Sequence, residues 1–376
     1  LPILLPATWF LYTPGAPPIS PLWLIICLTA FYIGTTMIIT PHQAWAPRLA
    51  RNYDERSRLF FWREMFTIAT MLVMLALPTL LSATGEYDRS AQISMMGLIL
   101  VVALPVTVFL SVWKVPDPMA GGVQPKTDFT LAAVKRALAD KPVRRILLVE
   151  IAVGIAIAGT AGTFLFAAEW GFGVVGLAPL VLMLHFVAGF AAMPVWVWIS
   201  KRTEKHLTMR SVCIWSAATF LLYIPLAAWG GPIALAIAAL ISGAGYGTPF
   251  FLTRSMMADV IELEEVRGGT NRSGMYYALM SGAYKTGAAF AIGIPYVLLE
   301  ALVGFTAGSE NSPETVRGLM IVFVAVPVVA YTLAALLIWR YPMTRAQQAQ
   351  AAEALAQGGQ NRPAALHVPL NDGDAT

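Results

Sequence analysis

Lys285 is the titratable residue of this sequence whose position most clearly demands a chemical reason. It lies about 12 residues into the apolar run near 273–301, which is roughly 18 Å along a helix. In a ~30 Å hydrocarbon core, an ammonium group at that depth costs several kcal/mol unless it is paired or hydrated. We therefore expect Lys285 to pair with a carboxylate that binds a cation or solute, with the Ser281 hydroxyl on the same face. The alternative is that its side chain only reaches for the nearer interface.

A polar stripe runs along the apolar segment near 19–46. Its members recur at spacings of four, four and three, so they share one helix face: Tyr32, Thr36, Thr40 and Gln43. Such a stripe in a membrane helix either lines a wet cavity or joins helices through hydrogen bonds. His42 lies beside it, and we include all five as candidate solute-binding residues.

Two groups of acidic and basic residues follow apolar segments at two distant places in the chain. The first contains Asp54, Glu55, Arg56 and Arg58, and the second contains Asp259, Glu262, Arg267 and Arg272. One interpretation is solvated loop charge, which contributes little to stability. The other is an inner gate, whose ion pairs form when the protein opens outward and break when it opens inward.

Motifs typical of soluble enzymes are absent. There is no phosphate-binding loop, no zinc-type Cys/His spacing and no nucleophile elbow, and the basic residues form no nucleic-acid stripe. His185 lies alone in the run LVLMLHFVAGF and is expected to hydrogen-bond a neighbouring helix, while Glu150 is a secondary candidate for function. We expect no enzymatic activity, no cofactor, no metal and no nucleic-acid partner.

The elements that must position these residues are membrane helices. The 376 residues are 57% hydrophobic and only 12% charged, with a mean hydropathy of +0.67. Soluble domains carry about 25% charged residues, so lipid must surround much of this chain. Ten apolar segments are predicted as helices, and the first is too short to span: 1–14, 19–46, 59–82, 91–113, 143–168, 174–200, 209–229, 231–257, 273–301 and 315–340.

Lysine and arginine are concentrated after every second segment, which predicts that those loops and the C-terminus are cytoplasmic. We expect residues 1–113 to form the remainder of an N-terminal helical bundle, and residues 143–342 a C-terminal six-helix bundle. Residues 114–142 are predicted to link them through an amphipathic helix capped by Thr127 or Asp128, with Phe129, Ala133 and Ala137 on one face. The tail 343–376 is predicted to be a partly disordered cytoplasmic segment.

An internal repeat supports this division. Thr40-Pro41 and Thr248-Pro249 lie in helices that each end in a charged exit, APRLARNYDERSR and MMADVIELEEVRGGTNRSG. Matching features six helices apart indicate two parallel structural repeats.

The stretches YDERSRLFFWRE, MADVIELEEVRGGTNRSG and YYALMSGAYKTGAAFAIGIP resemble the glycoside–pentoside–hexuronide:cation symporters, the melibiose-permease type of the major facilitator superfamily. That family has twelve helices, so the ten here would be its third to twelfth. We therefore expect an all-α integral membrane bundle of the major facilitator type. We also expect the chain to be an N-terminal truncation, with acid-bearing helices encoded upstream of Leu1.

By position, the resemblance implies that Lys285 is the family's intramembrane lysine and that Arg63 helps to hold sugar hydroxyls. It implies that Phe250 is the aromatic residue that packs on sugar. The chain departs from melibiose permease where that protein has an aspartate and a nearby tryptophan, because Ile39 and Gln43 stand there. This departure argues against a melibiose-like galactoside.

These expectations combine into a secondary transporter of a bacterial inner membrane, which we expect to be a monomer. It would carry a sugar or glycoside by alternating access, coupled to Na⁺ or H⁺. The closest alternative is the same fold carrying a lysolipid or another amphiphile, and more distant ones are a membrane-embedded enzyme or a structural scaffold.

Overall fold

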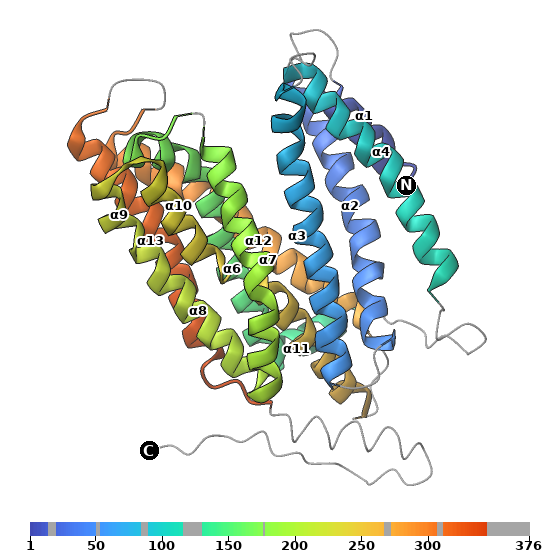
Figure 1. Cartoon of the computed structure of the whole chain (residues 1–376). Coiled ribbons are helices and arrows are strands. Elements are labelled where there is room, and N and C mark those ends of the chain that lie inside the picture. The colour runs from blue at the N-terminus through green and yellow to red at the C-terminus, as the bar shows by residue number, and fades with distance from the viewer. Residues whose placement is uncertain are drawn as a thin grey trace, which may run out of the picture. The chain divides into compact units, whose positions relative to one another are not determined.

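The computed structural model describes residues 1–13, 20–49, 53–83, 89–115, 130–175, 177–266, 272–306 and 311–343. Over these ranges the chain is helical, with no strand (Figure 1). Thr127, Asp128, Phe129, Arg267 and the tail lie outside the described residues, as does the side chain of Asp54.

The helices follow the predicted apolar segments closely. The α-helices are α1 Leu4–Tyr12, α2 Pro21–Leu49, α3 Tyr53–Ala83, α4 Arg89–Lys114, α5 Leu131–Ala139, α6 Lys141–Phe166, α7 Ala178–Arg202, α8 Lys205–Leu221, α9 Tyr223–Trp229, α10 Gly231–Gly243, α11 Thr248–Val266, α12 Ser273–Leu298 and α13 Pro313–Ile338. Two π-helical turns, η1 Ala167–Gly171 and η2 Leu299–Val303, extend α6 and α12.

Eight helical stretches within the described ranges are long and apolar enough to cross a membrane. They correspond to eight of the nine segments predicted to span, with α8–α9 and α10–α11 each counting as one stretch. The remaining segment is α12, which is 26 residues long but carries Ser281, Lys285 and Thr286 in its centre. These polar side chains lower its hydropathy, although its length of about 39 Å would suffice to span.

The chain divides into two compact units. The first unit holds Leu1–Leu49 and Thr70–Pro125, and the second holds Ala50–Ala69 and Lys126–Thr376. In the first unit, the short helix α1 packs against both α2 and α4. Glycines permit this approach, because a Cβ on Gly34 would lie 2.8 Å from the Leu4 side chain and one on Gly97 would lie 2.3 Å from that of Tyr12.

In the second unit, α6 packs against both α12 and α13, and α13 also packs against α8. The contact between α6 and α12 is backbone to backbone. A Cβ on Gly154 would lie 2.5 Å from the carbonyl oxygen of Tyr284, and one on Gly287 would lie 2.1 Å from that of Ile151. Only glycine permits two helices to come this close.

The segment near 231–257 is not one continuous helix. It breaks between α10 and α11, where Gly247 has φ of 80° in the left-handed region. A side chain at Gly247 would also collide with Met193 and Ile68. By contrast, α2 continues through Pro41, so the two Thr-Pro pairs of the proposed repeat occupy different local structures.

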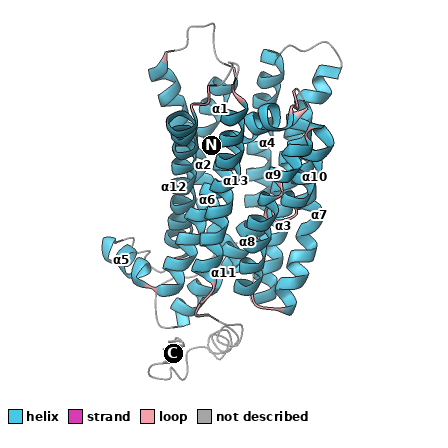
Figure 2. Ribbon diagram, turned by 90° about the vertical axis from the view of Figure 1, so that its left-hand side faces the viewer, coloured by secondary structure: helices cyan, strands magenta, loops and turns pink. Residues whose placement is uncertain are grey.

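The predicted amphipathic helix is present as α5, and Figure 2 shows it at the lower end of the second unit, near α12. Its N-terminal cap is Thr130, whose Oγ1 accepts a hydrogen bond of 3.2 Å from the Ala133 amide. The prediction that Thr127 or Asp128 caps this helix is wrong, because the helix starts later in the chain. Ala133 and Ala137 do share its buried face.

Candidate functional site

A buried ion pair links α6 and α11 inside the second unit. The Glu150 side chain, on α6, accepts hydrogen bonds at Oε1 from the Thr253 hydroxyl and from Arg254 Nη1, the latter at 3.2 Å. Glu150 is 1% exposed and Arg254 is 6% exposed. We call Glu150, Thr253 and Arg254 the α6–α11 charge cluster. Removing two charges from water costs free energy, which further hydrogen bonds to the remaining polar atoms can offset. A pair that lacks those hydrogen bonds is a candidate for function.

Two polar atoms of this cluster have no hydrogen-bond partner among the described residues. They are Oε2 of Glu150 and Nε of Arg254, and both are buried. Most buried polar atoms in folded proteins do have a partner. The cluster therefore retains capacity to accept one more donor at the carboxylate and one more acceptor at the guanidinium.

The guanidinium of Arg254 packs over one aromatic ring, which itself packs against two others. Its Cζ lies 5.2 Å from the centre of the Phe250 ring, which packs edge-on against Tyr284 of α12 at 5.4 Å and against Tyr246 at 6.5 Å. The Tyr277 hydroxyl donates to the Arg254 carbonyl at 3.2 Å. A ring face beside a cation, with hydroxyls close by, is the kind of surface on which a sugar packs.

The break before α11 brings this cluster to the start of a helix. Phe250 and Arg254 lie one turn apart just after Gly247, and Arg254 Nη1 also donates to the Phe250 carbonyl at 3.2 Å. Discontinuous helices of this kind form the substrate sites of many secondary transporters.

Arg63, which the family resemblance selected, lies on α3 in the same unit. Its Nη2 is 3.4 Å from Oε2 of the neighbouring Glu64, and its Cζ lies 5.9 Å from the Phe60 ring. Glu64 is buried, whereas the Arg63 side chain is partly exposed. Glu64 could not be singled out from the sequence, because an acidic residue next to an arginine is common in charged stretches and does not by itself indicate burial.

A second group of charges joins α3, α8 and α11. Arg56 Nη1 binds Glu262 and lies 3.5 Å from Oδ1 of Asp259, while Lys205 Nζ donates to Oδ2 of Asp259 at 2.6 Å. We call Arg56, Lys205, Asp259 and Glu262 the α3–α8–α11 ion-pair cluster. Arg56, Lys205 and Asp259 are buried. Nearby, the Ser57 and Ser255 hydroxyls are 3.0 Å apart.

This cluster contains Arg56, Asp259 and Glu262 from the two charged groups predicted to form an inner gate. Arg58 is exposed on α3, outside this cluster, and Arg272 instead lies 3.3 Å from Glu264. Tyr276 also donates to Glu264. Lys205 could not be singled out from the sequence, because a lysine at the first residue of α8, just after a short turn, looks like ordinary loop charge.

Lys285 and Ser281 both lie on α12. The Lys285 side chain is exposed, and that of Ser281 is partly buried. Lys285 directly follows Tyr284 on α12, and the Tyr284 ring packs on Phe250. Lys285 therefore lies on the stretch of α12 that contacts Phe250. The charges buried deepest in this unit are thus Glu150, Arg254 and Asp259 and their partners, and Lys285 is more accessible.

The polar stripe lies on α2 in the first unit. Tyr32 and His42 are exposed, Thr36 and Thr40 are partly buried, and Gln43 is buried. The Thr36 hydroxyl donates to the Tyr32 carbonyl at 2.6 Å, within the same helix. The Thr40 hydroxyl and Gln43 Oε1 have no hydrogen-bond partner in the described part of the chain.

His185 does hydrogen-bond a neighbouring helix, as expected. Its Nδ1 lies 3.2 Å from the Ser242 hydroxyl of α10, which is 3.1 Å from the Tyr223 hydroxyl. This chain of hydrogen bonds accounts for the histidine by packing alone.

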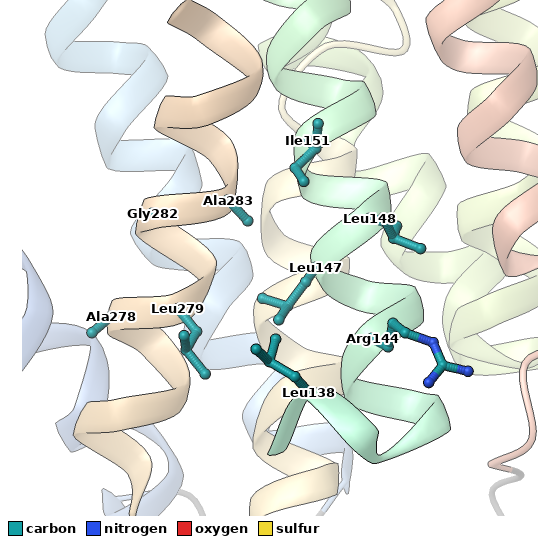
Figure 3. Close-up of a pocket in the computed structure, with 9 residues that line it drawn as sticks. All are labelled: Leu138, Arg144, Leu147, Leu148, Ile151, Ala278, Leu279, Gly282 and Ala283. Carbon is teal, nitrogen blue, oxygen red and sulfur yellow. The ribbon is translucent and has the colours of Figure 1, made fainter. Parts of the chain in front are cut away.

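A cavity of about 330 Å³ lies between α5, α6 and α12 (Figure 3). Its lining is apolar except for one arginine: Leu138, Arg144, Leu147, Leu148, Ile151, Ala278, Leu279, Gly282 and Ala283. Figure 3 shows the Arg144 guanidinium pointing away from α12, while Leu138, Leu147 and Leu279 point toward one another. This cavity is separate from the α6–α11 charge cluster.

Curated relatives of this chain are transport proteins. It is 24% identical over 313 residues to the glucuronide carrier protein homolog of Escherichia coli (strain K12), covering 82% of this chain and 67% of the relative. It is 24% identical over 326 residues to the isoprimeverose transporter of Lactiplantibacillus pentosus, covering 84% and 67%. 

Solved structures share the fold. A bacterial homologue of the iron transporter ferroportin, in its outward-facing state, aligns over 90% of this chain and 80% of its own, with a TM-score of 0.64 and 14% identity. The major facilitator transporter FucP, in its outward conformation, aligns over 89% and 79%, with a TM-score of 0.55 and 17% identity. The fold is that of the major facilitator superfamily.

Residues 1–345 match the family described as MFS/sugar transport protein, a span that includes every described residue. The resemblance to the melibiose-permease type, first seen in three sequence stretches, is confirmed by this match and by the two curated relatives. The protein is therefore an integral membrane transporter and not an enzyme, and it belongs to the sugar transport family of the major facilitator superfamily.

Proposed function

We propose that this protein is a secondary active transporter that carries a sugar or glycoside together with a cation, Na⁺ or H⁺, by alternating access. The observation that carries the proposal is the α6–α11 charge cluster, whose buried carboxylate and guanidinium each keep an unused hydrogen-bonding atom beside an aromatic ring. The names of the curated relatives, a glucuronide carrier homolog and an isoprimeverose transporter, support a sugar as the solute class.

We assign the solute-binding role to residues in both units. In the second unit these are Phe250, Arg63, Ser281 and Lys285. In the first unit they are the stripe on α2 and its neighbour: Tyr32, Thr36, Thr40, Gln43 and His42. The guanidinium and ammonium groups donate to sugar oxygens, and Phe250 offers a ring face for the apolar side of a pyranose.

The α3–α8–α11 ion-pair cluster is proposed as the inner gate. Its ion pairs would form in the outward-open state and break in the inward-open state, with Arg56, Asp259 and Glu262 joined by Lys205. Arg58 and Arg272, included on sequence grounds, would act at the edge of the gate. Buried ion pairs suit a switch, because losing one partner leaves an uncompensated charge.

The second candidate solute is a lysolipid or another amphiphile. The apolar cavity between α5, α6 and α12 favours it, because eight of its nine lining residues are apolar and Arg144 could bind a phosphate. We rank it below sugar because the curated relatives carry sugars by name.

The test is uptake by the protein from the complete gene, reconstituted in liposomes. The panel contains isoprimeverose, phenyl glucuronide, xylose, methyl galactoside and lysophosphatidylcholine, each offered with a Na⁺ gradient, a pH gradient or neither. We expect one sugar or glycoside to accumulate only with a gradient. Accumulation of lysophosphatidylcholine alone would favour the amphiphile, and uptake of no sugar under any gradient would refute the proposal.

A further inference from the structure

The α6–α11 charge cluster contains one group that can exchange a proton and one that cannot. Glu150 can be neutralised by a proton, whereas the Arg254 guanidinium stays charged in proteins. Glu150 lies nine residues beyond the start of α6 at Lys141, about 14 Å along the helix, at a depth where a lone charge is costly. Each charge is therefore tolerated because the other is present.

The groups that face Glu150 restrict what it can bind. Arg254 and Thr253 approach from α11, and electrostatic interactions reach it from Tyr284 of α12 and from Arg63 and Glu64 of α3. The described residues contain no group of three or more His, Cys, Asp or Glu side chains that could hold a metal ion. Arg254 lies 3.2 Å from the carboxylate and disfavours any second cation there, but a sodium ion would also need several oxygen ligands. A proton needs only one covalent O–H bond, and Oε2 of Glu150 is available to form it.

We propose that Glu150 carries the coupled proton and that Arg254, once released from it, binds an oxygen of the solute. This inference rests on the proposed function and names its coupling ion and its coupling pair. A proton from water forms an O–H bond on the Glu150 carboxylate, no electrons are transferred, and the same bond breaks when the proton leaves on the other side. The solute departs with it, and the ion pair forms again.

The geometry explains why the proton and the solute must cross the membrane together. A proton alone neutralises Glu150 and leaves the buried Arg254 without a carboxylate partner, with the uncharged Phe250 carbonyl as its remaining acceptor. A solute alone finds Arg254 already engaged by the carboxylate. With both bound, the sugar hydroxyl or carboxylate replaces Glu150 as the acceptor, and the unused Nε of Arg254 offers a second donor. Each ligand thus raises the affinity for the other, which is the requirement for coupling.

The test uses the full-length protein in liposomes that are free of sodium and contain a fluorescent pH indicator. The solutes are isoprimeverose and phenyl glucuronide, whichever the wild-type protein accumulates. With one pH unit across the membrane and no electrical potential, we expect wild-type accumulation of about tenfold, because one proton per solute transmits a tenfold concentration ratio. Adding solute should also acidify the liposome interior.

Glu150→Gln should reduce that accumulation to about onefold while solute exchange between equal concentrations continues, because exchange moves no net proton. Glu169→Gln is the matched control, since Glu169 is an exposed carboxylate on the η1 extension of the same helix; it should accumulate solute like the wild type. If Glu150→Gln does not fold, the double variant Glu150→Gln/Arg254→Gln removes both charges together and should likewise lose pH-driven accumulation.

Two results would overturn the inference while leaving the proposed function in place. One is wild-type accumulation driven by a sodium gradient and indifferent to pH. The other is a folded Glu150→Gln or double variant that still accumulates solute under a pH gradient as the wild type does. Failure of the wild-type protein to move any sugar, even by exchange, would instead refute the proposed function.

Discussion

At the scale of single residues, the sequence indicates which groups are charged and leaves open which of them meet. Lys205 and Asp259 are 54 positions apart, and Glu150 and Arg254 are 104 positions apart. No spacing rule links such positions, because the pairing depends on how α6, α8 and α11 pack. Arg56, Asp259 and Glu262 could be predicted as a group only because they lie in the two charged stretches that follow apolar segments at equivalent places of the repeat.

Lys285→Ala should abolish gradient-driven uptake and leave membrane insertion unchanged, because we assign its ammonium to solute or ion binding. Lys201→Ala, at the exposed end of α7, is the control and should transport normally. The measurement is uptake per inserted protein. Wild-type rate and stoichiometry in Lys285→Ala would remove this residue from the site.

Asp259→Lys should lower transport at least tenfold, because it places a third cation beside Lys205 and Arg56. Reversing Lys205 as well, in Asp259→Lys/Lys205→Asp, should restore part of the activity, since the 2.6 Å pair is rebuilt with its charges exchanged. Arg58→Glu should give no such rescue, because Arg58 is exposed. Additive effects in the double-mutant cycle would contradict a direct interaction.

At the scale of elements, hydropathy predicted the positions of the helices well, since lipid requires about 20 apolar residues for each crossing. It did not predict their interruptions. The break at Gly247 and the π-turns η1 and η2 arise from local backbone geometry, which an average over a long window cannot detect. The cap of α5 was misplaced for a related reason, because Thr127, Asp128 and Thr130 are all competent caps.

Gly287→Ala should destabilise the protein by about 1–3 kcal/mol, because its Cβ would lie 2.1 Å from the Ile151 carbonyl oxygen and must push α12 from α6. Gly293→Ala, on the same helix with nothing within 4 Å of the new Cβ, should be neutral or slightly stabilising. Thermal unfolding in detergent measures both. Equal melting temperatures for the two variants would argue against the close contact.

At the scale of the whole molecule, composition and charge asymmetry predicted a helical membrane protein, and the family match confirms the major facilitator fold. The orientation in the membrane remains a prediction, with the lysine- and arginine-rich loops and the C-terminus in the cytoplasm.

The orientation can be tested with one cysteine at each end of α7. Val175→Cys and Thr203→Cys both lie at exposed positions, and the native Cys27 and Cys213 are buried. A membrane-impermeant maleimide should label Val175→Cys in intact cells, and should label Thr203→Cys only after the membrane is permeabilised. Labelling of Thr203→Cys in intact cells would reverse the predicted orientation.

The glycine contacts between α6 and α12 also have a consequence for inheritance. Gly154 and Gly287 need not touch the solute, yet any replacement adds atoms where the facing backbone already stands. We therefore expect Phe250 and Arg63, which we propose bind the solute, to vary among descendants of this gene while these two glycines stay under purifying selection. The most slowly diverging positions of the lineage would then reflect how closely two helices pack. The residues that determine solute specificity would be found among the more variable positions.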